Sequence, residues 1–153
     1  MKKILTILFL FMGSYLCAQS NDDVLFQFCR NEYKVPDGCK KISENRIDCD
    51  NYSMQWQYGN NAFLTTMPEQ YVQELKKKNN KKFKKKPITC YLLNYELKGF
   101  KVSFKTDSGM TYKLITSGIV NKKIVLFQLS LFKEAKTNED IPEFPREFIK
   151  LTK

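Results

Sequence analysis

The sequence predicts a single α+β domain in which an antiparallel β-sheet, with a meander in its C-terminal half, is packed by a middle helix and a C-terminal helix and stapled by disulfides. Three observations predict this fold class. Four apolar-rich runs follow one another between residues 88 and 133, separated only by short turns. The segments 66–78 and 138–153 instead repeat their apolar residues at helical spacing. The chain also carries five cysteines, four of them beyond its apolar N-terminal segment.

Residues 1–18 have the layout of a cleaved secretory signal peptide. Two lysines precede an apolar segment at 4–16, which is shorter than the roughly 20 residues that span a bilayer. Ala18 supplies the small residue before the predicted cut, so residues 19–153 form one mature domain. The alternative is a lipoprotein with lipid on Cys17, but a leucine stands where that modification needs a small residue. We expect a periplasmic or secreted protein without stable membrane insertion after cleavage.

Four cysteines remain after the predicted cleavage, and an even number in an exported chain predicts two disulfides. They are Cys29, Cys39, Cys49 and Cys90. All three connectivities remain open. The short loop around a predicted turn favours Cys29–Cys39, which leaves Cys49–Cys90. A zinc site is not expected, because no two of these cysteines have zinc-motif spacing and the chain contains no histidine.

The segment 21–33 fits two structures. Leu25, Phe28 and Tyr33 recur at helical spacing, whereas Phe26 and Phe28 alternate as they would in a strand. We expect a short helix here.

The next elements are a turn, a hairpin and a strand. Residues 35–38, VPDG, predict a turn because proline presets its backbone angle and glycine accepts positive φ. Residues 39–49 predict a hairpin around Glu44 and Asn45. In 52–59, YSMQWQYG, large apolar and polar side chains alternate, which predicts a half-buried strand.

The middle helix is predicted over 66–78. Thr66 and Glu69 fit a capping box, and Pro68 falls in the first turn, where its missing N–H does no harm. Pro87 is expected to start the next strand. The predicted apolar face consists of Met67, Tyr71 and Leu75.

From residue 88 onward the pattern predicts antiparallel strands and then a helix. The turns at 106–109 and 121–123 are short enough to join antiparallel neighbours. The successive strand-like runs are 88–99, 100–109, 110–120 and 123–133. In the tail, one helical face is predicted from Ile141, Phe144, Phe148 and Leu151, with Pro145 at the helix start. We expect this face to dock on the sheet.

This element order resembles the PsbP-like α/β/α sandwich proteins. The part most like it is GFKVSFKTDSGMTYKLITSGIVNKKIVLFQLSLF, at 99–132, followed by IPEFPREFIKL at 141–151. The signal peptide resembles those of small exported Bacteroidota-type proteins. The family hosts adaptors, photosystem accessory proteins and small exported proteins, so the resemblance implies a fold and transfers no site.

Positive charge is concentrated in one segment, KKKNNKKFKKK at 76–86, called the lysine run below. It holds eight of the 26 basic residues in a chain of net charge +10. The run fits the solvated end of a helix and its loop, but it is also a possible site for a polyanion. Its lysines are Lys76, Lys77, Lys78, Lys81, Lys82, Lys84, Lys85 and Lys86.

The sequence lacks the residues of the common catalytic sites. Without histidine there is no Ser-His-Asp or Cys-His arrangement, and no phosphate-binding glycine loop is present. Asp48 and Asp50 are a candidate cation pair but lack the further ligands of a calcium loop. We therefore expect no catalytic residue, no metal and no cofactor.

Two functional hypotheses remain. The first is a non-enzymatic module that binds a protein partner, as an inhibitor or immunity protein does. The second is a binder of polyanions such as lipopolysaccharide, nucleic acid or acidic glycan through the lysine run.

Overall fold

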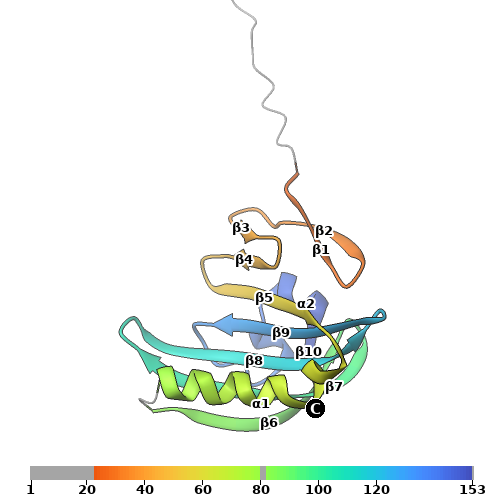
Figure 1. Cartoon of the computed structure of the whole chain (residues 1–153). Coiled ribbons are helices and arrows are strands. Elements are labelled where there is room, and N and C mark those ends of the chain that lie inside the picture. The colour runs from red at the N-terminus through yellow and green to blue at the C-terminus, as the bar shows by residue number, and fades with distance from the viewer. Residues whose placement is uncertain (1–22, 80–81, 153) are drawn as a thin grey trace, which may run out of the picture.

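The computed structural model describes residues 23–79 and 82–152 (Figure 1). The predicted signal peptide, its cleavage site and Cys17 lie outside these residues. The described chain is mostly β: an eight-stranded antiparallel sheet, curled into a half-barrel, and a separate two-stranded hairpin. The expected antiparallel sheet, C-terminal meander and middle helix are confirmed, while the C-terminal helix is short.

The large sheet has the strand order β10-β6-β7-β8-β9-β5-β4-β3. Its strands are β3 (Lys40–Ser43), β4 (Arg46–Asp48), β5 (Tyr52–Gly59), β6 (Lys84–Leu92), β7 (Tyr95–Thr106), β8 (Gly109–Val120), β9 (Lys123–Leu131) and β10 (Ile149–Leu151). The separate hairpin pairs β1 (Leu25–Phe28) with β2 (Asn31–Lys34). The helical elements are α1 (Asn61–Lys78), a short 3₁₀ turn η1 (Asn138–Asp140) and α2 (Glu143–Phe148).

The helix expected over 21–33 is wrong, because residues 25–34 form the β1–β2 hairpin. Phe26 and Phe28 alternate toward the core and are both buried, with Phe28 5.3 Å from the ring of Trp56. Burying both rings on one side of a strand outweighs the local helical pattern.

The neighbouring predictions hold. The turn at 35–38 is closed by the amide of Cys39, which donates to the carbonyl of Pro36 at 3.1 Å, and Gly38 adopts φ +79°. The β3–β4 hairpin turns at residues 44 and 45. In β5 the alternation places Met54 and Trp56 in the core.

Helix α1 begins at Asn61, five residues before the predicted N-cap. The capping box at Thr66 and Glu69 is therefore wrong, and Pro68 lies inside the helix instead of in its first turn. The buried centre of the helix is Val72. The predicted face of Met67, Tyr71 and Leu75 is half-buried beside it.

The meander differs from its prediction at two points. An unpredicted turn at Leu93 and Asn94 divides the run 88–99 between β6 and β7. Strand β6 already starts at Lys84, so Pro87 lies within it. The residues 84–88 have no described strand on their outer side, where the missing N–H of a proline costs no ladder bond. The turns around 107–108 and 121–122 are as predicted.

The sheet carries a hydrophobic cluster on each face. On one face the sheet packs against β1 and α2, with Trp56, Phe127 and Phe148 among the buried residues. On the other face α1 contributes Val72, which packs with Val102 and other strand residues. Because both faces are covered, the strands bury apolar side chains in both directions.

The tail contains less helix than expected. Phe148 and Ile141 are buried, as predicted, but the chain forms η1 and α2 and then leaves the helix. Leu151 lies in β10, which pairs with the end of β6. Strand pairing at the open edge of β6 therefore replaces the last predicted helical turn.

The predicted disulfide pairs, Cys29–Cys39 and Cys49–Cys90, are wrong. The disulfide joins Cys39 to Cys49, and Cys29 and Cys90 are free and buried. The β3–β4 hairpin pairs Lys40 with Asp48, so the two cysteines that flank it stand side by side, with their Cα atoms 4.3 Å apart. The register of the β3–β4 hairpin thus determines that Cys39 pairs with Cys49.

Candidate functional site

The lysine run does not form one continuous surface. Its first three lysines end α1, Lys82 is exposed in the following turn, and Lys84–Lys86 begin β6. The expectation of a helix end plus loop is therefore wrong for Lys84–Lys86. Lys81 lies outside the described residues.

Side chains alternate along β6, which separates its lysines. Lys85 turns toward α1, where its ammonium lies 2.5 Å from the carboxylate of Glu69 and 4.0 Å from the ring centre of Phe100. Its neighbours Lys84 and Lys86 point to the opposite face. These lysines also occupy the unpaired part of β6, where charge and Pro87 keep other strands from adding to the edge.

Asp48 and Asp50, the candidate cation pair, do not form a metal site in the described structure. Asp48 accepts two hydrogen bonds from Arg46, at 2.8 and 2.7 Å. Over 23–79 and 82–152, no group of three or more Cys, Asp or Glu side chains is placed to hold a metal ion.

A polar cluster on the α1 side of the sheet surrounds Lys113. Its ammonium donates to Oε1 of Gln128 at 3.1 Å, and the same oxygen accepts a hydrogen bond from Tyr71 at 2.5 Å. Burial, with a smaller contribution from Arg46, lowers the pKa of Lys113 to about 8. Burial in this cluster therefore destabilises the charged form of Lys113.

Three two-residue turns gather at one end of the molecule, at 29–30, 93–94 and 121–122; this surface, with Tyr58 and Tyr95, is called the hairpin end below. All six turn residues have positive φ, although none is glycine. Two-residue turns with positive φ match the right-handed twist of the strands that they join. Asn tolerates this conformation and occurs in two of the three turns.

Asn121 ties the turns together. Its Nδ2 donates to the carbonyl of Cys29 at 3.0 Å, and its Oδ1 accepts a hydrogen bond from the hydroxyl of Tyr95 at 3.0 Å. The amide of Cys29 donates to the Tyr58 hydroxyl at 2.8 Å. Leu93, in the third turn, donates its amide to the carbonyl of Phe148 at 2.8 Å. The hairpin end is therefore held by hydrogen bonds between its turns and to the core.

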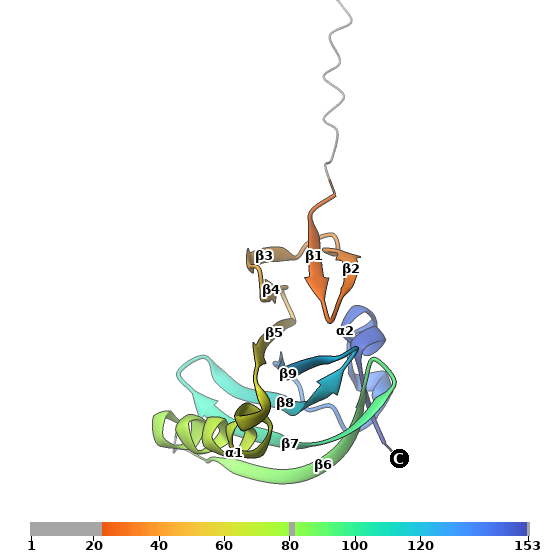
Figure 2. The same cartoon turned by 45° about the vertical axis from the view of Figure 1, so that its right-hand side comes forward.

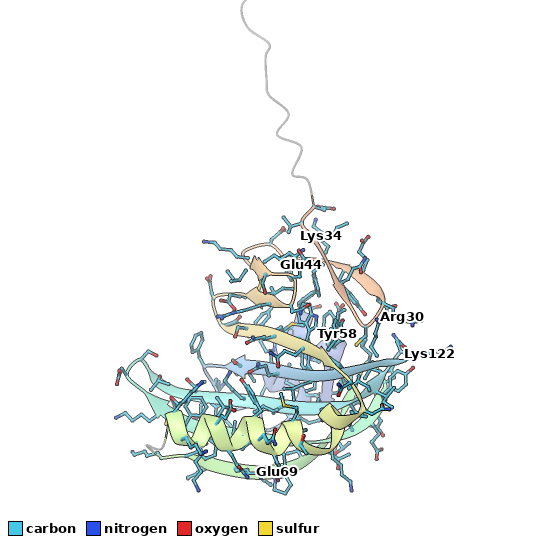
Figure 3. All side chains as sticks on the ribbon, viewed as in Figure 1. Arg30, Lys34, Glu44, Tyr58, Glu69 and Lys122 are labelled. Carbon is cyan, nitrogen blue, oxygen red and sulfur yellow. A yellow bond between two sulfur atoms is a disulfide. The ribbon has the colours of Figure 1, made fainter. Side chains whose placement is uncertain are left out.

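The exposed chemistry of the hairpin end is aromatic and basic. Tyr58 and Tyr95 are 40% and 42% exposed. Arg30 and Lys122 project from neighbouring turns near Tyr58 (Figure 3), and the ammonium of Lys123 lies 6.0 Å from the Tyr58 ring centre. Burial raises the pKa of Tyr58, so its hydroxyl stays neutral.

The cysteine in this region is not suited to nucleophilic chemistry. Burial raises the pKa of Cys29 to about 11, which keeps the thiol protonated at neutral pH. The hairpin end therefore presents aromatic and basic side chains on turns that are held by hydrogen bonds. Sequence reasoning identified only the turn at 121–122, because the other turns lack the glycine that marks such hairpins.

No family model and no curated protein matches the chain. The resemblance to PsbP-like proteins therefore rests on the sequence pattern alone. In the part of the chain that the structure describes, no helix has the length and apolar character needed to cross a membrane.

Proposed function

We propose that this protein is an exported, non-enzymatic binding domain that engages a protein partner in the periplasm or at the cell surface, in an inhibitor or immunity type of role. The observation that carries the proposal is the hairpin end. Three adjacent turns, joined through Asn121, present tyrosine and basic side chains on a rigid sheet. Loops positioned by a rigid scaffold are a common setting for recognition.

The composition of the hairpin end suits a protein interface. Tyrosine and arginine are enriched among the residues that dominate binding energy, because they combine large contact area with hydrogen bonding. The turns 29–30 and 121–122 are hydrogen-bonded to each other, and Leu93 of the third turn is hydrogen-bonded to Phe148. Little conformational entropy is therefore lost when a partner docks.

The charge of this surface favours an acidic partner. Arg30, Lys122 and Lys123 provide three cations. Glu96 accepts a hydrogen bond from the hydroxyl of Tyr91 at 3.0 Å. A partner patch that carries carboxylates would complement the cations and associate faster at low salt.

A pair of matched double variants tests the proposal. Arg30→Asp with Lys122→Asp reverses two charges at the hairpin end, and aspartate tolerates the positive φ of both positions. Lys82→Asp with Lys84→Asp makes the same change of charge in the lysine run, and Lys82 also has positive φ.

The immobilised proteins are incubated with envelope extract from the producing cells, and captured proteins are identified by mass spectrometry. We expect an acidic protein captured by the unmodified domain and by the lysine-run variant, and lost from the hairpin-end variant. Equal capture by all three proteins, or loss only in the lysine-run variant, would contradict the assignment to the hairpin end.

Binding of polyanions is the alternative function, and the exposure of the described lysines of the lysine run favours it. If five lysines engage phosphates of a single strand, log K should fall with log salt at a slope of about −3.5, at roughly 0.7 per contact. Replacing the five lysines between residues 81 and 86 with glutamine should then abolish that slope. Titrations with single-stranded DNA and lipopolysaccharide at two salt concentrations decide this, and no binding at low salt ends the alternative.

A further inference from the structure

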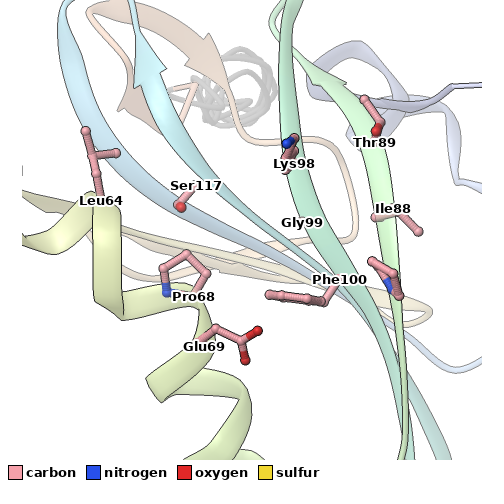
Figure 4. A pocket seen from close by; sticks show the side chains of 10 residues that line it. Leu64, Pro68, Glu69, Ile88, Thr89, Lys98, Gly99, Phe100 and Ser117 are labelled. Atoms are coloured by element: carbon pink, nitrogen blue, oxygen red, sulfur yellow. The ribbon is translucent and has the colours of Figure 1, made fainter.

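A cavity of about 580 Å³ opens between α1 and the sheet (Figure 4). It lies between the N-terminal half of α1 and the middle of β6 and β7. Its apolar wall consists of Leu64 and Pro68 from the helix and Ile88 and Phe100 from the strands. This volume is within the range of roughly 300–1,000 Å³ that small-molecule sites occupy.

The cavity follows from the shapes of its two walls. Helix α1 is straight (Figure 1), whereas β6 and β7 curve away from it toward α2 (Figure 2). Gly99 permits tight packing of β7 on β8, since a Cβ at this position would lie 2.2 Å from the carbonyl oxygen of Ile115. The sheet can therefore bend here, and the gap remains beside the helix.

The rim of the cavity carries one uncompensated positive charge. Glu69 also lines the cavity, but its carboxylate is paired with the ammonium of Lys85 at 2.5 Å. Lys98 lines the opposite wall, on β7. Within the described residues the Lys98 ammonium has no hydrogen-bond or ion-pair partner.

We infer that this cavity binds a small amphiphile with one carboxylate and an apolar chain, of the medium-chain fatty acid class. The chain lies against Phe100, Ile88 and the helix residues, and the carboxylate pairs with the ammonium of Lys98. The cavity supplies apolar surface for the chain, and the unpaired cation selects an anionic head group. The site shares no lining residue with the hairpin end, so the inference stands apart from the proposed function.

Calorimetric titration with decanoate, below its micelle concentration, tests the inference. Two further probes divide the chemistry: decanol has the chain without the charge, and butyrate has the charge with little chain. We expect saturable binding of decanoate and weaker binding of both probes. Lys98→Gln should weaken decanoate binding at least about tenfold, the range for a hydrogen bond to a charged group, and leave decanol unchanged.

Lys105→Gln is the matched control, because Lys105 is also an exposed lysine of β7 but does not line the cavity. It should bind decanoate as the unmodified protein does. Amide shifts in the NMR spectrum locate the ligand and should centre on residues 98–100 and Ser117. The inference is overturned by absence of saturable binding, by equal losses in both lysine variants, by decanol binding as tightly as decanoate, or by shifts centred elsewhere.

Discussion

Phe148→Ala should lower the free energy of unfolding by about 3–5 kcal/mol, the range for removal of a large buried aromatic side chain. Phe148 is 1% exposed. Its ring centre lies 4.6 Å from that of Tyr33, 5.2 Å from Phe144 and 5.7 Å from Phe28. The side chain thus joins α2 to the β1–β2 hairpin, and its loss leaves a cavity between elements that no other ring can easily fill.

Urea unfolding followed by circular dichroism measures this change. Phe132→Ala is the control, because Phe132 is 66% exposed and its removal should change the free energy by less than about 0.5 kcal/mol. Phe148→Leu keeps most of the apolar volume and should fall between the two. A loss below about 1 kcal/mol for Phe148→Ala, or one equal to that of Phe132→Ala, would show that α2 does not dock as described.

Three further predictions concern the cysteines and the half-buried Lys113. Alkylation without reduction should modify neither Cys29 nor Cys90 in the native mature protein and both after denaturation, whereas modification of all four cysteines by intact mass would contradict the disulfide. Replacing Cys39 and Cys49 with alanine should cost about 2.7 kcal/mol in urea melts, from the chain entropy of a sequence separation of 10, and an unchanged midpoint would refute the bond. Lys113 has a folded pKa of about 8, below its ordinary 10.5, so its penalty is full below pH 8 and is relieved as pH rises toward 10.5. Lys113→Met should therefore stabilise the protein at pH 7, by a margin that shrinks toward about pH 9.5, and a constant margin would disprove the burial of a charged lysine.

Local patterns predicted the strands well where apolar and polar side chains alternate clearly along the chain. The strand 52–59 and the turns at 121–122 and 107–108 follow from side-chain alternation and turn residues within a few positions of each other. The candidate site was largely not predictable. The hairpin end depends on contacts between residues far apart in sequence, such as Asn121 with the carbonyl of Cys29.

The errors have a common origin. Residues 21–33 and the tail each have apolar residues at helical spacing. Their aromatic rings reach the core, however, from a strand in the first segment and from a short helix in the second. The start of α1 was predicted too late because the sequence pattern T-x-x-E is only a local signal. Packing of the helix on the sheet extends it N-terminally from Pro68 to Asn61.

The sequence by itself determined the alternating strands, the middle helix, the buried face that contains Phe148 and the accumulation of lysine in one segment. The expectation of export also comes from the sequence alone. Tertiary structure decided which cysteines pair, which face each lysine of β6 occupies, which turns meet and where α1 leaves a cavity. These features depend on strand register and sheet curvature, and both are set by contacts between distant segments that no local pattern records.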